Sequence, residues 1–353
     1  MAELALKAAP DATTSLDPIC GTGAVTRTQR FAGGLVVSLV AAVGALGHAA
    51  VQAFPLRPVT IVVPFAAGGA VDTIARILAD RMRVPLGQPV IIDNVGGGGG
   101  SIGTGRVVRA APDGYTLCLG SWATHVVYGA VYPLKYDLLN DLEPVALVES
   151  HALVIVARKT FPADDLSGFI AWLRANPDKA SLGSSGIGSG PHVVGAFLQR
   201  MTGTRFQFVP YRGLGPAMQD LVSGQIDFLI DGAANALPQV RAGSVKAYAV
   251  TAKHRLAAAP EIPTVDEAGV PGFYASSWYA LWAPKGTPKD VIGTLNAAVS
   301  LAFADPATSR QLAHLGLELP PREQWTPEAL GAYHKAEIEK WWPIIKAANL
   351  AAQ

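Results

Sequence analysis

Short apolar runs alternate with amphipathic segments along almost all of the chain after residue 53. The apolar runs have the length and β-branched character of strands, whereas the amphipathic segments repeat at spacings of three and four. The pattern predicts strands at Val59–Pro64, Val90–Asp93, Thr116–Gly120, Val145–Leu147, Leu153–Ala157, Leu182–Ser184, Gln207–Val209, Phe228–Asp231 and Ala247–Thr251. It predicts helices at Val71–Met82, Ser101–Arg109, Leu166–Asn176, Pro191–Thr202, Gly215–Ser223, Ala234–Ala242, Lys289–Phe303, Ala307–Leu315 and Pro327–Ala348. This alternation is typical of an α/β protein.

Two segments about 120 residues apart share one plan of strand, glycine-rich turn and helix. The first contains "VPFAAGGAVDTIARIL", with Gly68 and Gly69 at the junction of strand and helix. The second is "LGSSGIGSGPHVVGAFLQRM", in which serines and glycines from Ser184 to Gly190 fill the turn. Two such units suggest two lobes, each of which offers the N-terminus of a helix to a shared cleft.

The glycine turns indicate an anion site. The first N–H groups of a helix have no partner within the helix, and the aligned peptide dipoles favour a negative charge there. Gly68 and Gly69 would let these donors approach an anion without an intervening side chain. The alternative is that the glycines serve only to turn the chain tightly.

Three polar side chains near these turns each allow more than one interpretation. Asp72, in the first turn of the first helix, either complements the helix dipole and caps N–H groups, braces the loop, or contacts the ligand through water. Bracing is favoured, since a bare carboxylate beside an anion would repel it. His192, just inside the second helix, is either a ligand donor or a capping residue. Asp231 ends the strand "IDFLID", where it is either a cleft residue of an open α/β sheet or a turn-forming aspartate.

The N-terminal region has the features of a secretory signal. Arg27 and Arg30 precede the apolar run "FAGGLVVSLVAAVGALGHAAVQA", which ends in small residues and predicts cleavage after Ala53. The alternative is a membrane anchor, although the run is rich in glycine and alanine. The acidic residues before Val25 do not fit a signal, and we expect translation to start near Val25. The mature protein, from Phe54 onward, is then exported.

Composition and charge exclude several classes of function. The 353 residues are 50% hydrophobic and carry a net charge of +1, with no basic run suited to nucleic acid. Two cysteines make no disulfide framework, and Cys118 lies in the apolar stretch "YTLCLG", where a buried thiol is expected. "NVGGGGGSIGTGRVV" lacks the lysine of a phosphate-binding loop, and "GSWAT" lacks the second glycine of a nucleophile elbow. The histidines are scattered and show no metal-ligand spacing.

Several strings together resemble one family. They are "PFAAGGAVDTIAR", "IIDNVGGGGGSIGTGRVVRAAPDGYTL", "SSGIGSGPHVVGAFL", "VPYRGLGPAMQDLVSGQIDFLID" and "IPTVDEAGVPGF". The chain resembles the Bug-type, TctC-like receptors of tripartite tricarboxylate transporters, which are periplasmic solute-binding proteins. The resemblance implies an α/β, two-lobed periplasmic-binding-protein type II fold with hinged domains and a ligand cleft between them. One lobe would comprise residues 54–157 and 276–353, the other residues 158–275, with crossings near Ala157–Arg158 and Ala275–Ser277, and residues 1–53 would be the N-terminal extension and signal peptide.

The resemblance also implies which residues bind the ligand. Two loops would grip one carboxylate of the ligand, largely through backbone N–H groups and ordered water. Carried over by motif, the ligand-binding residues are Phe65, Ala66, Ala67, Gly68, Gly69 and Asp72 in the first loop, Ser184, Ser185, Gly186, Gly188 and His192 in the second, and Tyr211, Gly213 and Asp231 around the cleft. Two departures concern loop shape: Val95 replaces a common arginine, and Ala67 replaces a common proline.

The predicted function is therefore a receptor, not an enzyme, that captures a small carboxylate by lobe closure. It would act as a monomer without cofactor, metal or nucleic acid, and would deliver the ligand to membrane subunits of a tripartite tricarboxylate transporter. Arg212 and Arg241 are candidates for a second positive contact. One alternative is an exported enzyme with Ser184 or Ser185 as nucleophile and His192 as base. Another is a receptor that docks on a sensor kinase.

Overall fold

The computed structural model describes residues 54–186, 188–314, 317 and 319–350. The predicted signal peptide and its cleavage after Ala53 lie outside these residues. The strands are β1 (Val59–Val63), β2 (Val90–Asn94), β3 (Thr116–Ser121), β4 (Leu142–Arg158), β5 (Ser181–Ser184), β6 (Gln207–Pro210), β7 (Phe228–Gly232), β8 (Val245–Val250) and β9 (Ser276–Pro284).

The predicted helices all appear, with ends shifted by a few residues. They are α2 (Ala70–Leu86), α3 (Ser101–Val108), α5 (Leu166–Ala175), α6 (Gly190–Thr202), α7 (Leu214–Ser223), α8 (Ala233–Arg241), α9 (Lys289–Ala304), α10 (Pro306–His314) and α11 (Pro327–Ala347). The sequence pattern missed a π-helical turn, η2 (Ala123–Val127), which continues into α4 (Tyr128–Val131), and two short 3₁₀ turns, η1 (Gly98–Gly100) and η3 (Arg322–Gln324).

The strands form one continuous sheet in the order β2-β1-β3-β9-β4-β7-β5-β6, with β8 also paired to β4. β1 is parallel to β2 and β3, and β5 is parallel to β6 and β7. β9 is antiparallel to β3 and β4, and β4 is antiparallel to β7 and β8. We call the part around β1–β3 and β9 sheet A, and the part around β5–β8 sheet B. Each is a mainly parallel α/β sheet closed by antiparallel strands.

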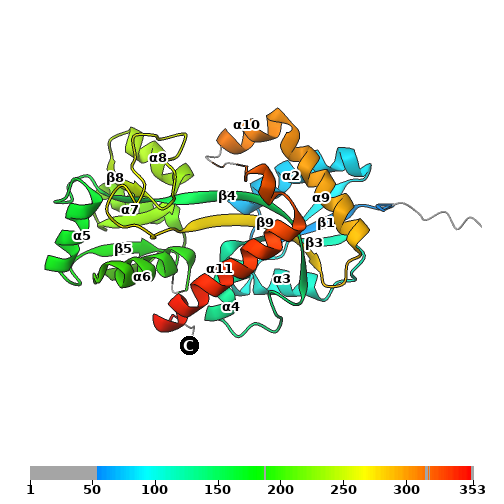
Figure 1. The fold of residues 1–353 in the computed structure, drawn as a ribbon, viewed down its shortest axis with the longest axis horizontal. Coiled ribbons are helices and arrows are strands. Elements are labelled where there is room, and N and C mark those ends of the chain that lie inside the picture. Colours follow the sequence, from blue (N-terminus) through cyan, green and yellow to red (C-terminus); the bar gives the residue numbers. More distant parts are fainter. Residues whose placement is uncertain (1–53, 187, 315–316, 318, 351–353) are drawn as a thin grey trace, which may run out of the picture. The chain divides into compact units, whose positions relative to one another are not determined.

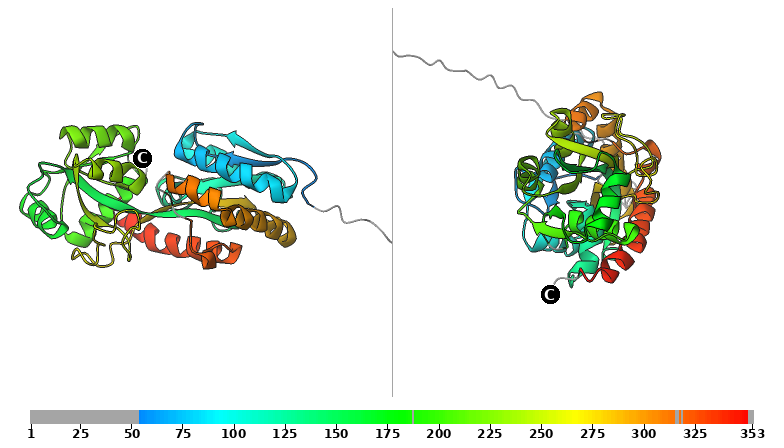
Figure 2. Two further views of the ribbon diagram at one scale, coloured as in Figure 1. Left: turned by 90° about the horizontal axis from the view of Figure 1, so that it is seen from above. Right: turned by 90° about the vertical axis from the view of Figure 1, so that its left-hand side faces the viewer.

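β4 belongs to both sheets, and here the sequence-based prediction was wrong. The strands predicted at Val145–Leu147 and Leu153–Ala157 are one strand of 17 residues, and its partner β9 was not predicted at all. β4 pairs with β9 as far as Ala152, with β7 from Leu153 onward and with β8 from Val154 onward. This exchange of partners lies five residues before the crossing expected at Ala157–Arg158. Figures 1 and 2 show β4 passing between the two groups of helices, with β9 beside it.

Helices cover both faces of each sheet. In sheet A, apolar residues of α2 and α9 pack with alternate residues of β1 and β3 on one face, and residues of α3 and α11 pack on the other. In sheet B, α7 and α8 cover one face, and α5 and α6 cover the other. Figure 1 shows α2, α9 and α8 above the strands and α3 and α6 below them. This layering leaves the carboxyl ends of the parallel strands free to carry a site.

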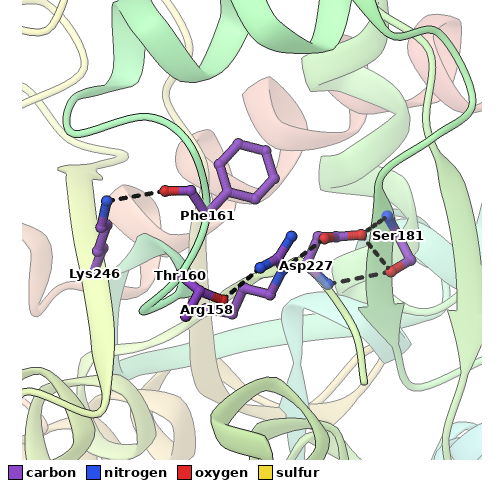
Figure 3. Close-up of polar contacts among 6 residues, drawn as sticks. All are labelled: Arg158, Thr160, Phe161, Ser181, Asp227 and Lys246. Carbon is purple, nitrogen blue, oxygen red and sulfur yellow. Dashed lines mark hydrogen bonds and ion pairs between the residues drawn. The ribbon is translucent and has the colours of Figure 1, made fainter. Parts of the chain in front are cut away.

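The outer end of sheet B is tied together by the carboxylate of Asp227 (Figure 3). Its Oδ1 accepts a hydrogen bond of 2.9 Å from Nε of Arg158 at the end of β4. Its Oδ2 accepts bonds of 2.8 and 2.9 Å from the backbone N–H and the hydroxyl of Ser181 at the start of β5. Because the Asp227 side chain is largely buried, these bonds join β4, β5 and the start of β7 in a region with little competition from water.

We expect Asp227→Ala to destabilise the protein by about 3 kcal/mol, because it leaves three largely buried donors without their acceptor. Urea unfolding followed by circular dichroism measures this loss. The control is Asp164→Ala, which removes the exposed partner of Lys246 and should leave the unfolding midpoint unchanged. Equal midpoints for Asp227→Ala and the wild type would contradict the prediction.

Candidate functional site

A cavity of about 850 Å³ lies where both glycine-turn helices begin. Phe65 and Thr73 border it from the β1–α2 turn, and Ser185, Ser189 and Gly190 border it from the β5–α6 turn. Two further helix starts reach the same cavity, that of η2 at Ser121–Ala123 and that of α8 at Gly232–Ala234. The chain thus brings four groups of helix N-terminal amides to the border of one cavity, of which the sequence predicted two.

The first glycine turn is held by Asp72. Gly68 has a φ of +85°, a conformation that residues with a side chain rarely adopt, and its N–H donates a bond of 2.9 Å to Oδ2 of Asp72. The same oxygen accepts from Nε of Arg76 at 3.0 Å. The hydrogen bonds from Arg76 and Gly68 lower the pKa of Asp72 to about 2. The structure shows the bracing contact favoured for Asp72, and this contact occupies one of the loop's amide donors.

The second glycine turn is held in the same way by His192. Gly188 has a φ of +72°, and its N–H donates a bond of 3.0 Å to Nδ1 of His192, again four residues ahead. The imidazole is buried against Phe208, with ring centroids 4.2 Å apart, and burial lowers its pKa. Since Nδ1 must keep its lone pair to accept this bond, the neutral ring is the form that braces the loop. The two turns therefore share not only their sequence plan but also the contact that fixes them, a glycine N–H bonded to a side chain four residues ahead.

The predicted site residues fall into three sets. Phe65, Ser185 and Asp231 line the cavity. The loop residues Ala66, Ala67, Gly68, Gly69, Ser184, Gly186 and Gly188 form the two turns beside it, with Asp72 and His192 as braces. Tyr211 and Gly213 are not among the cavity-lining residues; the Tyr211 N–H donates to the carbonyl of Ser184 at 2.7 Å, and Gly213 is the N-cap of α7.

His192 borders a different hollow, with Phe208 and the end of α11. Among the described residues it makes no hydrogen bond to Ser184 or Ser185, so the geometry does not assemble the nucleophile and base of the enzyme alternative. Arg241 does line the cavity, and its guanidinium donates to the carbonyl of Ala258 at 2.8 Å. Arg212 is exposed. Cys118 is fully buried, as predicted, and burial raises the pKa of its thiol to about 12.

Ser189 is a cavity residue that the sequence analysis passed over. It is the N-cap of α6, yet its hydroxyl makes no capping bond, and Oγ is buried without a hydrogen-bond partner in the described part of the chain. A buried hydroxyl without a partner costs free energy, so its position at the cavity marks a place where a ligand or water completes the bonding. A signal was available, because serine is a favoured N-cap residue and Ser189 stands two residues before the helix start predicted at Pro191.

The middle of β4 contributes a second polar group that sequence reasoning missed. His151 lines the cavity, and its Nδ1 lies 3.0 and 3.1 Å from the two carboxylate oxygens of Glu149, which is fully buried. Burial raises the pKa of Glu149. Burial alone would lower the pKa of His151, but the charge and hydrogen bond of Glu149, with the charge of Asp231, outweigh it and raise the pKa.

Asp231 stands next to this pair at the end of β7. It is 5% exposed; Oδ1 accepts from the N–H of Gly232 at 2.7 Å, and Oδ2 accepts from the side-chain amide of Asn235. Burial raises the pKa of its carboxyl group. Of the two interpretations of Asp231, the structure supports the cleft residue, since its side chain lines the cavity.

Residues 54–350, with the gaps noted above, contain no helix with the length and apolar character needed to span a bilayer. Within the same residues no three histidine, cysteine or acidic side chains gather as they would around a metal ion. The polar groups that the described residues bring to the cavity are mainly hydrogen-bond donors at helix starts.

Comparison with known proteins identifies the family. The model of the tripartite tricarboxylate transporter family receptor matches residues 74–350. The periplasmic binding protein BugD is 40% identical, with a TM-score of 0.72 over 85% of this chain and all of that one. MatC from Rhodopseudomonas palustris, solved with bound malate, is 41% identical, with a TM-score of 0.72 over 83% of this chain and all of that one. A further R. palustris structure, solved with adipate, is 32% identical, with a TM-score of 0.73 over 85% of this chain and 99% of that one.

These matches confirm the predicted α/β, two-lobed fold of the periplasmic binding proteins. Each solved structure is covered almost from end to end, so the likeness extends over both sheets and the cavity. The chain belongs to the family of tripartite tricarboxylate transporter receptors.

Proposed function

We propose that this protein is an extracytoplasmic receptor that captures a small carboxylate in the cavity and delivers it to a membrane transporter of the tripartite tricarboxylate type. The observation that carries the proposal is the pair of glycine turns on one cavity, with the unpartnered hydroxyl of Ser189 beside them. Family membership supports a solute-binding role, and the solved relatives with malate and adipate support a carboxylate as ligand.

Hydrogen-bond donors and apolar burial together account for binding of ordinary strength. A micromolar ligand requires about −8 kcal/mol. Hydrogen bonds to a charged group contribute roughly 1.5–3 kcal/mol each, and a helix N-terminus adds about 0.3–2 kcal/mol. These gains offset an association cost of about 4–15 kcal/mol. Burial of the ligand against apolar lining residues such as Trp122, Leu153 and Ile230 contributes the rest.

Several finer points belong to the same proposal. The receptor is periplasmic after removal of residues 1–53, it acts as a monomer, and it releases its ligand chemically unchanged. Ligand binding brings together lobes formed by residues 54–157 with 276–353 and by residues 158–275. The exchange of β4 partners at Ala152–Leu153 and the start of β9 at Ser276 support two crossing strands as the region that bends.

Isothermal titration of the purified protein with malate, citrate, adipate and benzoate tests this function. We expect a dissociation constant in the micromolar range for at least one acid. Ser189→Ala should weaken that binding by about fivefold to tenfold, because a charge-assisted hydrogen bond is lost. The matched control is Ser309→Ala on the exposed side of α10, which should bind as the wild type does.

Two results would overturn the proposal. One is the absence of binding to every acid by a protein shown by native mass spectrometry to carry no ligand. The other is chemical conversion of a bound acid, detected by mass spectrometry after incubation, which would favour an exported enzyme. Unchanged affinity of Ser189→Ala would remove this residue from the site.

A further inference from the structure

The pair of Glu149 and His151 holds a proton at the cavity wall. Glu149 is inaccessible to solvent, and both of its oxygens lie within hydrogen-bond distance of Nδ1 of His151. Nδ1 is thereby committed to the protein interior. Nε2 has no hydrogen bond among the described residues, is not among their fully buried unpartnered atoms, and belongs to a ring that lines the cavity. The outer nitrogen of His151 is thus available to a ligand.

With one proton shared between the two side chains, Nε2 carries hydrogen in either arrangement. If Glu149 is ionised, His151 is an imidazolium with hydrogen on both nitrogens; if Glu149 is protonated, its O–H donates to Nδ1 and the neutral ring has hydrogen on Nε2. Each group separately favours retention of this proton, since the pKa values of both are raised. The pair presents a hydrogen-bond donor to the cavity in both cases.

Asp231 presents an acceptor at the same place. Leu153 pairs with Gly232 and Val154 with Asp231, so the end of β7 lies beside this part of β4. His151 and Asp231 both line the cavity, and the charge of Asp231 acts on the His151 ring. A Cβ placed on Gly232, the residue after Asp231, would be 3.3 Å from Nε2 of His151, so the end of β7 and this ring border the same part of the cavity. Oδ1 of Asp231 accepts one hydrogen bond from Gly232, and Oδ2 accepts one from Asn235. Each oxygen therefore keeps one lone pair that can accept a hydrogen bond from a ligand.

This combination disfavours both kinds of charged ligand group at that position. A second carboxylate would be repelled by Asp231, and an ammonium group has no lone pair with which to accept the hydrogen bond that Nε2 of His151 donates. Of the described residues that line the cavity, Arg241 is the only lysine or arginine, and its guanidinium is already bonded to Ala258. A hydroxyl group both accepts and donates, so it satisfies the donor and the acceptor at once.

We propose that His151 and Asp231 form a hydroxyl-recognising subsite, with Glu149 as the positioning residue of His151, so that the receptor prefers hydroxycarboxylates to the same acids without the hydroxyl. The inference rests on the proposed function, in which the glycine turns hold the ligand's carboxylate. A site with both partners placed for a hydroxyl rejects the deoxy analogue strongly, because the analogue leaves buried polar groups unpaired.

The test compares acids that differ only in a hydroxyl group. The probes are malate against succinate, citrate against tricarballylate, and 6-hydroxyhexanoate against hexanoate, titrated calorimetrically into the purified protein at pH 7. We expect at least one hydroxylated acid to bind about tenfold or more tightly than its partner. Equal affinities within every pair would overturn the subsite and leave the receptor function standing, whereas failure of ligand-free protein to bind any of the six acids, adipate or benzoate would overturn both.

Variants assign the preference to residues. His151→Ala should bring the affinity ratio of the best pair close to one while leaving the deoxy acid's affinity within about threefold, and the exposed His254→Ala is its control. Asp231→Asn keeps an acceptor oxygen but removes the charge. It should strengthen succinate relative to malate, a gain that a misfolded protein cannot show. An unchanged ratio in both variants would overturn the assignment.

The pH profile reports the shared proton. The groups that face His151 are Glu149 on its own strand, Asp231 on β7 and Tyr279 on β9. Tyr333 on α11 lies near Glu149, and the charge of Glu149 contributes to the raised pKa of Tyr333. Since the pKa of His151 is raised, its proton is held below that pKa and is lost as the pH rises through it. The hydroxyl preference should therefore shrink at alkaline pH. Glu149→Gln should remove this dependence, whereas a pH-independent preference in the wild type would overturn the role of the pair.

Discussion

Gly120→Ala is expected to destabilise the protein by about 3 kcal/mol or more and to lower its melting temperature by roughly 5–10 °C. A Cβ at this position would lie 1.8–2.7 Å from three atoms of the His125 ring, far inside van der Waals contact. The ring is fully buried, bonded through Nδ1 to the hydroxyl of Thr124 at 2.9 Å and stacked on Trp282 at 5.0 Å. Relief of the clash would have to displace η2, whose start borders the cavity.

The control for this prediction is Gly293→Ala. Gly293 is an exposed residue within α9, where a new Cβ meets no atom within 4 Å. Alanine should stabilise this helix by about 0.5–1 kcal/mol, because glycine loses more backbone freedom on folding. Thermal unfolding by calorimetry should therefore move the two variants in opposite directions, and a wild-type melting temperature for Gly120→Ala would refute the packing argument.

Asp72→Ala is expected to weaken carboxylate binding by about tenfold although Asp72 does not line the cavity. The substitution removes the carboxylate oxygen that accepts the Gly68 N–H at 2.9 Å. The first turn is then no longer ordered before binding, and the free-energy cost of ordering it reduces the affinity for the ligand. Calorimetric titration measures the change. Asp80→Ala, at an exposed site on the same helix, should leave the affinity unaltered, and equal losses in the two variants would show that the turn needs no brace.

Acid should affect the two braces at different pH values. The pKa of Asp72 is lowered from 3.8 to about 2, so the stability it contributes is present above pH 3.8 and is lost as the pH falls towards 2. The pKa of His192 is lowered by burial from 6.5, so the neutral brace is complete above pH 6.5 and is lost as the pH falls through the lowered value. As the pH falls, the second turn should therefore lose its brace before the first turn does.

His192→Gln isolates this effect. The glutamine amide oxygen can accept from the Gly188 N–H but does not titrate, so the acid-side loss of affinity should largely disappear while affinity at pH 7.5 stays within a few fold. The same acid-side decline in the variant as in the wild type would place its origin elsewhere.

Local patterns in the sequence were sufficient for the two glycine turns. Each follows a short apolar strand and precedes a strongly periodic helix, and both features depend on neighbouring residues alone. The bracing role of Asp72 also followed from sequence, because a carboxylate in the first helical turn has few alternatives to the local amides. The choice between ligand donor and brace for His192 required the structure, since it depends on packing against Phe208, sixteen residues away.

The strand β4 shows why the rest could not be predicted. Pro144 looks like the boundary before one short strand, and the polar run Glu149–His151 looks like the break before a second. The structure instead continues one strand and shifts its register at Pro144/Ala146 and Leu147/Glu149. The polar run is tolerated because Glu149 and His151 satisfy each other beside the cavity. Glu149 and His151, which made this segment look unlike a strand, thus contribute to the site. Such exceptions to the local sequence preferences of strands are expected at functional sites.

The shared strand also determines how the molecule can be divided. In sheet B, β4 lies between β7 and β8, so a fragment of residues 159–275 would lack its central strand and expose the pairing edges of both neighbours. Such a fragment is expected to aggregate when expressed alone. Dissection of this receptor therefore calls for circular permutants that keep residues 142–158 intact, and two complementary polypeptides cut after Arg158 should become soluble only when they are produced together.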